Sequence, residues 1–271
     1  MKKIEQTYGY DDVAIVPGEI TLNPELVETK TKIGDLELAV PVLASAMDSV
    51  VDPNFAKQLS NLGGAGVINL DGIHVRYEDT EEIYKEIIST PQKEVTELLQ
   101  KVYSAPMKEN LIGEVVKRIK ESGEKCFASF VPASTKKFAP IAVEAGCDAV
   151  VVQSTVTTAR HNSKSLEGLI LSKLVDSLNV PIIVGNTVTY NVTRELMEQG
   201  VHGILVGVGP GSACTSREVL GVGVPQISAT LECSSARDDY FKLTGRYVSI
   251  ITDGGIRTGG ELCKSFVAGA D

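Results

Sequence analysis

Residues 203–217 read GILVGVGPGSACTSR, an apolar run followed directly by a glycine-rich loop. The uninterrupted apolar run at 203–206 predicts a buried strand. Glycines in the loop let backbone N–H groups approach an anion closely, and Cys214 stands among hydroxyl residues as a candidate nucleophile. This one segment therefore offers both a phosphate-binding loop and a thiol for covalent chemistry.

Six more apolar runs of similar length are spread over the chain. They are residues 41–44, 65–69, 126–131, 149–153, 181–186 and 248–252. None alternates strictly between apolar and polar residues, which is typical of strands buried on both faces of a parallel sheet. Helix candidates stand between them, at residues 55–62, 140–145, 187–199 and 261–266. The alternation of strands and helices predicts successive βαβ units.

Seven strands in this order predict an α/β fold, a (β/α)8 TIM barrel that is incomplete at its C-terminal end because eight strands are needed. An eighth strand would begin near 268–271, so we expect either a fragment or a naturally short chain. We expect 1–271 to form a single catalytic barrel domain, with 72–125 as a helical connection and no separate domain. The charged part of it, 76–112, predicts a solvated helical excursion. The alternative fold is an open doubly wound sheet, but no Gly-x-Gly-x-x-Gly follows the first strand.

Composition narrows the classes of partner. The net charge is −9, which argues against nucleic acid or an anionic membrane as the main partner. No apolar run is long enough to span a bilayer, and we see no signal peptide. The five cysteines are scattered without a Cys-x-x-Cys pair, and the three histidines share no metal-ligand spacing. A reducing cytoplasm therefore fits better than a disulfide framework or a zinc site.

Polar residues gather where the predicted strands end, which is the active face of a (β/α)8 barrel. Asp253-Gly254-Gly255 follows a predicted strand and precedes a predicted helix. The Asp253 carboxylate could accept hydrogen bonds from two hydroxyls, as from a ribose, and the glycines could expose N–H groups to a phosphate. The alternative interpretation is a tight turn with a capping aspartate. For Cys214 the alternative is a small buried apolar side chain.

Several ordered motifs accompany the 203–217 loop. They are YDDV at 10–13 with VPG at 16–18, ASAMD at 44–48, GGAGVI at 63–68, GNTVT at 185–189, GVGVPQ at 221–226 and DGGIRTGG at 253–260. With them the chain resembles the IMP dehydrogenase / GMP reductase family over nearly its whole length. Most IMP dehydrogenases carry a CBS regulatory module after the second strand, for which 72–125 is too short. This resembles GMP reductases and also the bacterial IMP-dehydrogenase-related proteins that lack the module. The segments YED at 77–79 and ARDDY at 236–240 are most similar to that last group.

The resemblance implies a role for each candidate site residue. Cys214 would be the nucleophile, with Ser216 as the catalytic hydroxyl that replaces the usual threonine. The substrate-binding residues would be Ser45, Met47, Asn186, Ser212, Asp253, Gly254 and Gly255. The cofactor-binding residues would be Gln153, Ser154, Thr155 and Gly207. A potassium ion would be held by main-chain oxygens of Gly209, Gly211 and Cys214.

The resemblance also implies an oxidoreductase that acts at C2 of a purine nucleoside 5′-monophosphate. Val224 favours the IMP dehydrogenase direction, IMP and NAD to XMP and NADH, as in GMP biosynthesis. The missing CBS module favours the alternative, GMP reductase, which converts GMP and NADPH to IMP and ammonia. Further alternatives are an inactive fragment or nucleotide-binding module, and a phosphate-binding barrel of another family. The family is usually tetrameric. This chain departs from the family pattern at two positions. Gln153 stands where an aspartate commonly contacts the cofactor, and Leu205 stands where an arginine is common.

Overall fold

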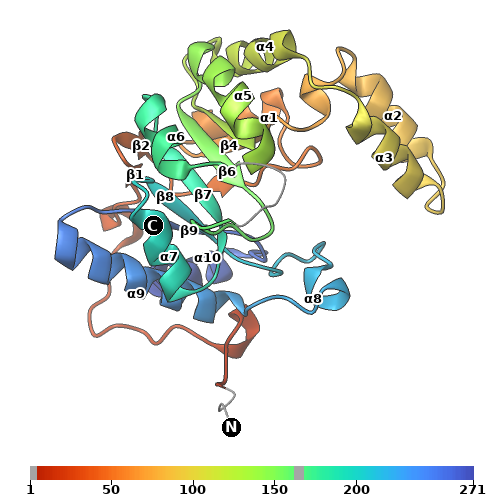
Figure 1. Cartoon of the computed structure of the whole chain (residues 1–271). Helices are drawn as coiled ribbons and strands as arrows, with labels where there is room; N and C mark the ends of the chain where they lie inside the picture. Colours follow the sequence, from red (N-terminus) through yellow and green to blue (C-terminus); the bar gives the residue numbers. More distant parts are fainter. Residues whose placement is uncertain (1–4, 162–167) are drawn as a thin grey trace. The chain divides into compact units, whose positions relative to one another are not determined.

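All seven apolar runs form strands in the computed structural model, which describes residues 5–161 and 168–271. The strands are β3 (Leu43–Ala44), β4 (Ala65–Asn69), β5 (Cys126–Phe130), β6 (Ala149–Gln153), β7 (Ile182–Thr187), β8 (Gly203–Val206) and β9 (Ser249–Thr252). Helices stand between them (Figure 1). The fold is therefore α/β, and the described residues supply seven of the eight strands of a (β/α)8 barrel, as predicted.

The chain divides into two compact units. In the described residues, the first unit comprises 5–41, 153–161, 168–177 and 181–271, and the second comprises 42–152 and 178–180. The expectation of a single domain over 1–271 stays a prediction.

The second unit holds β3, β4, β5 and β6 as parallel neighbours in chain order. Helices α1 (Pro53–Asn61), α4 (Glu109–Lys120) and α5 (Pro132–Glu144) pack on these strands and on one another. Gly66 lies in β4 where α1 comes closest, because a Cβ there would be 2.8 Å from the Cα of Ala56. The side chains of Phe127 and Phe130 are fully buried in this core.

Residues 72–125 of the second unit are largely helical. They form η3 (Ile73–Val75), α2 (Thr80–Ser89), α3 (Val95–Ser104) and α4. Helices α2 and α3 pack against each other as a pair (Figure 1). The α2 side chains are all half-buried or exposed, and in α3 the buried side chain is Val102. Most side chains of the α2–α3 pair in this helical excursion are therefore half-buried or exposed, and the expected connection without a separate domain stays a prediction.

The first unit holds β7, β8 and β9 as parallel neighbours. Its helices are α6 (Leu171–Ser177), α7 (Tyr190–Met197), α8 (Ser216–Val219), α9 (Gln226–Thr244) and α10 (Gly259–Val267). Helices α7 and α9 pack on each other and on the strands. The short elements η1 (Tyr10–Asp12), η2 (Pro24–Leu26) and the antiparallel pair β1 (Thr31–Ile33) and β2 (Leu36–Leu38) precede them and had no counterpart in the sequence analysis.

Two predicted helix boundaries are wrong. The helix predicted at 140–145 begins at Pro132, so Pro140 lies inside α5. A proline there removes one helical N–H and disfavours the helix, and burial of Phe138 and Ala139 in the core compensates. The helix predicted to begin at residue 187 begins at Tyr190, because β7 continues through Thr187.

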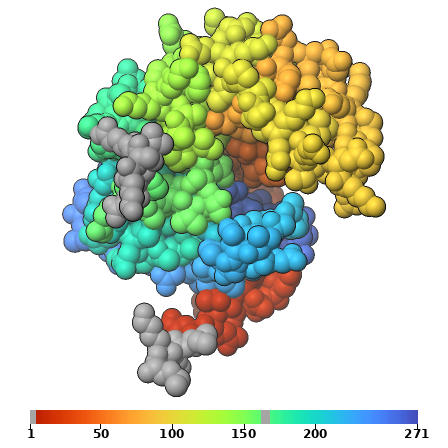
Figure 2. All heavy atoms as spheres, turned by 45° about the vertical axis from the view of Figure 1, so that its right-hand side comes forward, coloured from red at the N-terminus to blue at the C-terminus, as the bar shows by residue number. Residues whose placement is uncertain are grey.

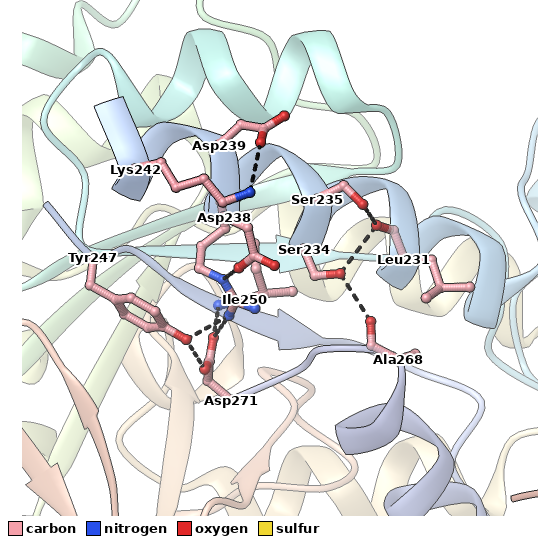
Figure 3. A network of polar contacts seen from close by, with 11 residues as sticks. Leu231, Ser234, Ser235, Asp238, Asp239, Lys242, Tyr247, Ile250, Ala268 and Asp271 are labelled. Carbon is pink, nitrogen blue, oxygen red and sulfur yellow. Dashed lines mark hydrogen bonds and ion pairs between the residues drawn. The ribbon is translucent and has the colours of Figure 1, made fainter. Parts of the chain in front are cut away.

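A network of polar contacts fixes residues 268–271 beside β9 in the first unit (Figure 3). The Asp271 N–H donates to the Ile250 carbonyl at 2.9 Å, and its carboxylate accepts from the Ile250 N–H at 2.8 Å. The same carboxylate pairs with Arg237 of α9 at 2.6 Å. These bonds hold Asp271 beside Ile250 of β9, and the expected eighth strand stays a prediction. Among the described residues, no helix has the length and apolar character that a membrane crossing requires.

Candidate active site

The loop after β8 packs against the turn after β9 through Pro210. A Cβ on Gly255 would lie 2.7 Å from the Pro210 carbonyl oxygen, and one on Gly254 would lie 3.1 Å from the Pro210 ring. Both glycines have positive φ, 88° and 78° for Gly254 and Gly255, which L side chains rarely adopt. These glycines therefore let the Asp253 turn and the cysteine loop meet backbone to backbone.

Arg217 holds the far side of the loop. Its guanidinium donates to the Val224 carbonyl at 2.8 Å. Its side chain passes so close to Gly209 and Gly223 that a Cβ at either would lie within 2.8 Å of its Cγ. The loop that carries Cys214 is thus tied at both ends, and Figure 2 shows it with α8 as light-blue atoms at the surface. No role was predicted for Arg217, although glycines at both 209 and 223 were a signal of a close approach.

Cys214 is exposed and lies just before α8. Its Sγ is 3.3 Å from the Ser216 hydroxyl oxygen. Hydrogen bonds from the Ser216 side chain and backbone, together with the Arg217 charge, lower the pKa of the Cys214 thiol below its usual value. A lowered pKa favours the thiolate, which is the nucleophilic form. Cys126, Cys147 and Cys233 are buried, and burial raises the pKa of each of these thiols.

Two side-chain amides hold the Asp253 carboxylate where β9 ends. Gln153 donates to Asp253 Oδ2 at 3.0 Å, and Asn186 donates to the same oxygen at 2.8 Å. Gln153 also donates to Asn186 Oδ1 at 3.1 Å. Asn186 is buried, while Gln153 and Asp253 are half-buried. The structure therefore joins three of the predicted site residues, from the ends of β6, β7 and β9, in one hydrogen-bonded group.

Other predicted site residues of the first unit lie outside this hydrogen-bonded group and differ in burial and in hydrogen-bond partners. Ser154 bonds to the Val156 carbonyl at 2.9 Å and to the Thr157 hydroxyl at 2.8 Å. Thr155 and Ser212 are exposed. Gly207 is buried, and its N–H donates to the Thr187 carbonyl at 3.1 Å.

Ser45 and Met47 belong to the second unit, in the connection between β3 and α1. The Met47 N–H donates to the Ser45 carbonyl at 2.8 Å, and the Met47 carbonyl accepts from Val50 and Val51. The Met47 side chain is 46% exposed and Ser45 is half-buried. This connection is thus an internally hydrogen-bonded loop that presents an apolar thioether to the outside.

Main-chain oxygens are the groups that could hold a cation in the cysteine loop. Across residues 5–161 and 168–271, no cluster of three or more His, Cys, Asp or Glu side chains could bind a metal ion. The Gly211 carbonyl accepts from the Cys214 N–H at 3.0 Å, and Gly209 turns the chain with φ of 73°. Carbonyl oxygens suit hard cations, so the donor set fits an alkali metal ion better than a transition metal.

Comparisons with known proteins agree with the motifs. The family model of the IMP dehydrogenase / GMP reductase domain matches residues 7–271. The chain belongs to the IMP dehydrogenase / GMP reductase family. An uncharacterized oxidoreductase of Mycolicibacterium smegmatis is 34% identical over 273 residues, which cover 98% of this chain and 73% of that protein. An inosine-5′-monophosphate dehydrogenase of Cryptosporidium parvum is 32% identical and is matched over 99% of this chain and 66% of its own length.

A solved structure of an IMP dehydrogenase/GMP reductase-like protein from Corynebacterium glutamicum has the same fold. It superposes with a TM-score of 0.92 at 31% identity, over 99% of this chain and 72% of that one. The predicted family is therefore confirmed, and the chain is an oxidoreductase of the IMP dehydrogenase / GMP reductase family.

Proposed function

We propose that the chain oxidises or reduces a purine nucleoside 5′-monophosphate at C2 through a covalent adduct on Cys214. One observation carries this proposal: an exposed cysteine with a lowered pKa stands in a glycine loop that packs against the Asp253 turn. A buried structural cysteine has neither exposure nor a stabilised thiolate. The family of purine-nucleotide enzymes to which the chain belongs supports the choice of substrate class.

The nucleotide would be held mainly by groups of the first unit. Asp253 keeps its carboxylate oriented by two amides, and in this role it would accept the ribose hydroxyls. The backbone of Gly254 and Gly255 and the exposed Ser212 would bind the 5′-phosphate, with Asn186 close to the nucleotide. A role for Ser45 and Met47 in substrate binding, implied by the family resemblance, stays part of the proposal.

The proposed reaction begins when the Cys214 thiolate adds to C2 of IMP and forms a carbon–sulfur bond. The hydrogen on C2 then leaves as a hydride, and a nicotinamide cofactor, NAD or NADP, supplies the acceptor for it. A water molecule adds to C2 of the covalent thioimidate, the carbon–sulfur bond breaks, and XMP and the thiol are released. Ser216 would stabilise the thiolate before the addition and again on release.

The cofactor would lie against Gln153, Ser154, Thr155 and Gly207. Potassium would be held by carbonyl oxygens of Gly209, Gly211 and Cys214, which would fix the loop around the nucleophile. The full family assembly would be a homotetramer. Five free cysteines favour a reducing, cytoplasmic compartment.

The IMP dehydrogenase direction is the main proposal, supported by Val224 and by relatives named as such. GMP reduction is the second candidate, favoured because residues 72–125 fold as helices that leave little room for a regulatory module. In that direction the thiolate would displace ammonia from C2 of GMP, and NADPH would deliver the hydride that gives IMP.

Absorbance at 340 nm tests both directions with the purified chain and KCl. A rise with IMP and NAD supports the first direction, and a fall with GMP and NADPH supports the second. Cys214→Ala should abolish either signal, while Cys263→Ala, which removes the other exposed thiol, should leave it unchanged. Turnover by Cys214→Ala at the parent rate would overturn the covalent mechanism. Calorimetric binding of IMP without turnover would instead indicate a nucleotide-binding module.

A further inference from the structure

The loop that carries Ser45 and Met47 is tied at its centre to the helical pair α2–α3. Tyr103, near the end of α3, donates to Asp48 Oδ2 at 2.7 Å. Tyr84 of α2 donates to the Asp48 backbone carbonyl at 3.2 Å. Both tyrosines thus bond to the residue that directly follows Met47.

The backbone of η3 supplies the third bond to Asp48. The Ile73 N–H donates to Asp48 Oδ2 at 2.9 Å. Gly72 permits this approach, because a Cβ there would overlap the Asp48 carboxylate. The other oxygen, Oδ1, is buried and has no hydrogen-bond partner in the part of the chain that the structure describes. Tyr103 and Ile73 are therefore the donors that compensate the burial of this carboxylate, and loss of either is costly.

The Tyr84 and Tyr103 hydroxyls stay protonated, so both can donate to Asp48 over a wide pH range. Burial and the neighbouring Asp48 raise the pKa of Tyr84 to about 12. Burial and the bond to Asp48 also raise the pKa of Tyr103. Both hydroxyls remain protonated donors at any pH near neutrality. Tyr84 is further fixed by His74, whose ring packs edge-on against it with Nε2 3.3 Å from its hydroxyl.

We propose that Tyr84 and Tyr103 are positioning residues that set the Met47 loop for the purine nucleotide. The proposal rests on the proposed function for the role of that loop, and it gives the helical excursion a task beyond linking two strands. The loop spans residues 45–51, and its own backbone bonds join Ser45, Met47, Val50 and Val51 to one another. The bonds to Asp48 join this turn to α2, α3 and η3 of the second unit.

The test compares a Tyr84→Phe/Tyr103→Phe double variant with Tyr77→Phe. Tyr77 belongs to the same excursion, but its hydroxyl donates to the Val102 carbonyl at 3.1 Å and not to Asp48. We expect the double variant to raise the KM for IMP about tenfold with kcat nearly unchanged, about 1.4 kcal/mol of binding. Tyr77→Phe should leave both constants at the parent values. Equal KM values in all three proteins, or an equal rise in Tyr77→Phe, would overturn the proposal.

A second measurement separates this proposal from the proposed function. The chain has four methionines, so methyl-labelled methionine gives a simple NMR spectrum in which Met47→Leu identifies the Met47 signal. Without nucleotide, the Met47 methyl signal should shift or broaden in the double variant and stay in place in Tyr77→Phe. An unmoved signal would overturn the positioning role even if the enzyme turns over IMP. If the Met47 signal moves in the double variant but the parent chain neither binds nor oxidises IMP, the proposed purine-nucleotide function is wrong. The contact of Tyr84 and Tyr103 with the Met47 loop would still hold.

Discussion

The Gln153 side-chain amide donates a 3.0 Å hydrogen bond to Asp253, the carboxylate proposed to hold the ribose. The two residues are 100 positions apart and come from the ends of β6 and β9. Gln153 was assigned to the cofactor side, and a cofactor contact there stays a prediction. The bond to Asp253 gives it a second task, because a neutral donor at 153 orients the carboxylate without competing with it.

Gln153→Glu tests this relationship through pH. A second carboxyl beside Asp253 has its pKa raised in the folded state, so its repulsion is small near pH 4.5 and grows as the pH rises. We expect the free energy of unfolding to fall below the parent value by about 1–3 kcal/mol at pH 8, as for loss of a bond to a charged group. Urea titrations at several pH values measure the difference. Gln153→Met should give a loss that does not change with pH, and a pH-independent loss in Gln153→Glu would contradict the coupling.

Ser216→Ala should make Cys214 a weaker nucleophile. The Ser216 hydroxyl is the main cause of the lowered pKa of Cys214, so its removal raises that pKa and shifts the alkylation profile to higher pH. At pH 7 we expect iodoacetamide to react with Cys214 about two- to fivefold more slowly. A factor of this size corresponds to the free energy of one exposed hydrogen bond. Peptide mass spectrometry follows Cys214, with exposed Cys263 as the internal reference. An unchanged profile would show that Ser216 does not tune the thiol.

Gly255→Ala should disrupt the packing of the two loops. The position has φ of 78°, and a Cβ would lie 2.7 Å from the Pro210 carbonyl oxygen. We expect a loss of at least about 1–2 kcal/mol in unfolding free energy from the left-handed backbone. Gly259→Ala is the matched control, because its Cβ meets open space at the start of α10 and it should be neutral or stabilising. Equal urea midpoints for the two variants would argue against the contact.

Arg237→Met should destabilise the first unit strongly. Its side chain is only 9% exposed and pairs with Asp271, and the Tyr247 hydroxyl lies 2.7 Å from the guanidinium. Figure 3 labels Tyr247 and Asp271, which lie beside each other. Removing one partner of such a buried pair costs about 3–5 kcal/mol. Lys242→Met on the same helix breaks an exposed pair with Asp239 and should cost no more than about 1 kcal/mol. Thermal unfolding of both variants measures the difference. Similar losses would contradict a stabilising role of the buried Arg237–Asp271 ion pair.

Much of the fold followed from local pattern. Strands such as 65–69, 149–153 and 203–206 match their predicted bounds, because residues buried on both faces must be apolar without interruption. Helix α9 had no such signal. Its buried side chains include Thr230, Cys233, Ser234 and Arg237, so small and polar groups replace the apolar stripe that marks a helix in sequence.

The sequence by itself determined the βα order, the family and the candidate nucleophile, since these depend on residues that are neighbours along the chain. Only the tertiary structure decided that Gln153 and Asn186 hold Asp253, that Pro210 joins two glycine turns, and that Tyr84 and Tyr103 reach Asp48. Hydrogen bonds act over about 3 Å in space, whatever the separation in sequence. Such partners become neighbours only once strands and helices have packed.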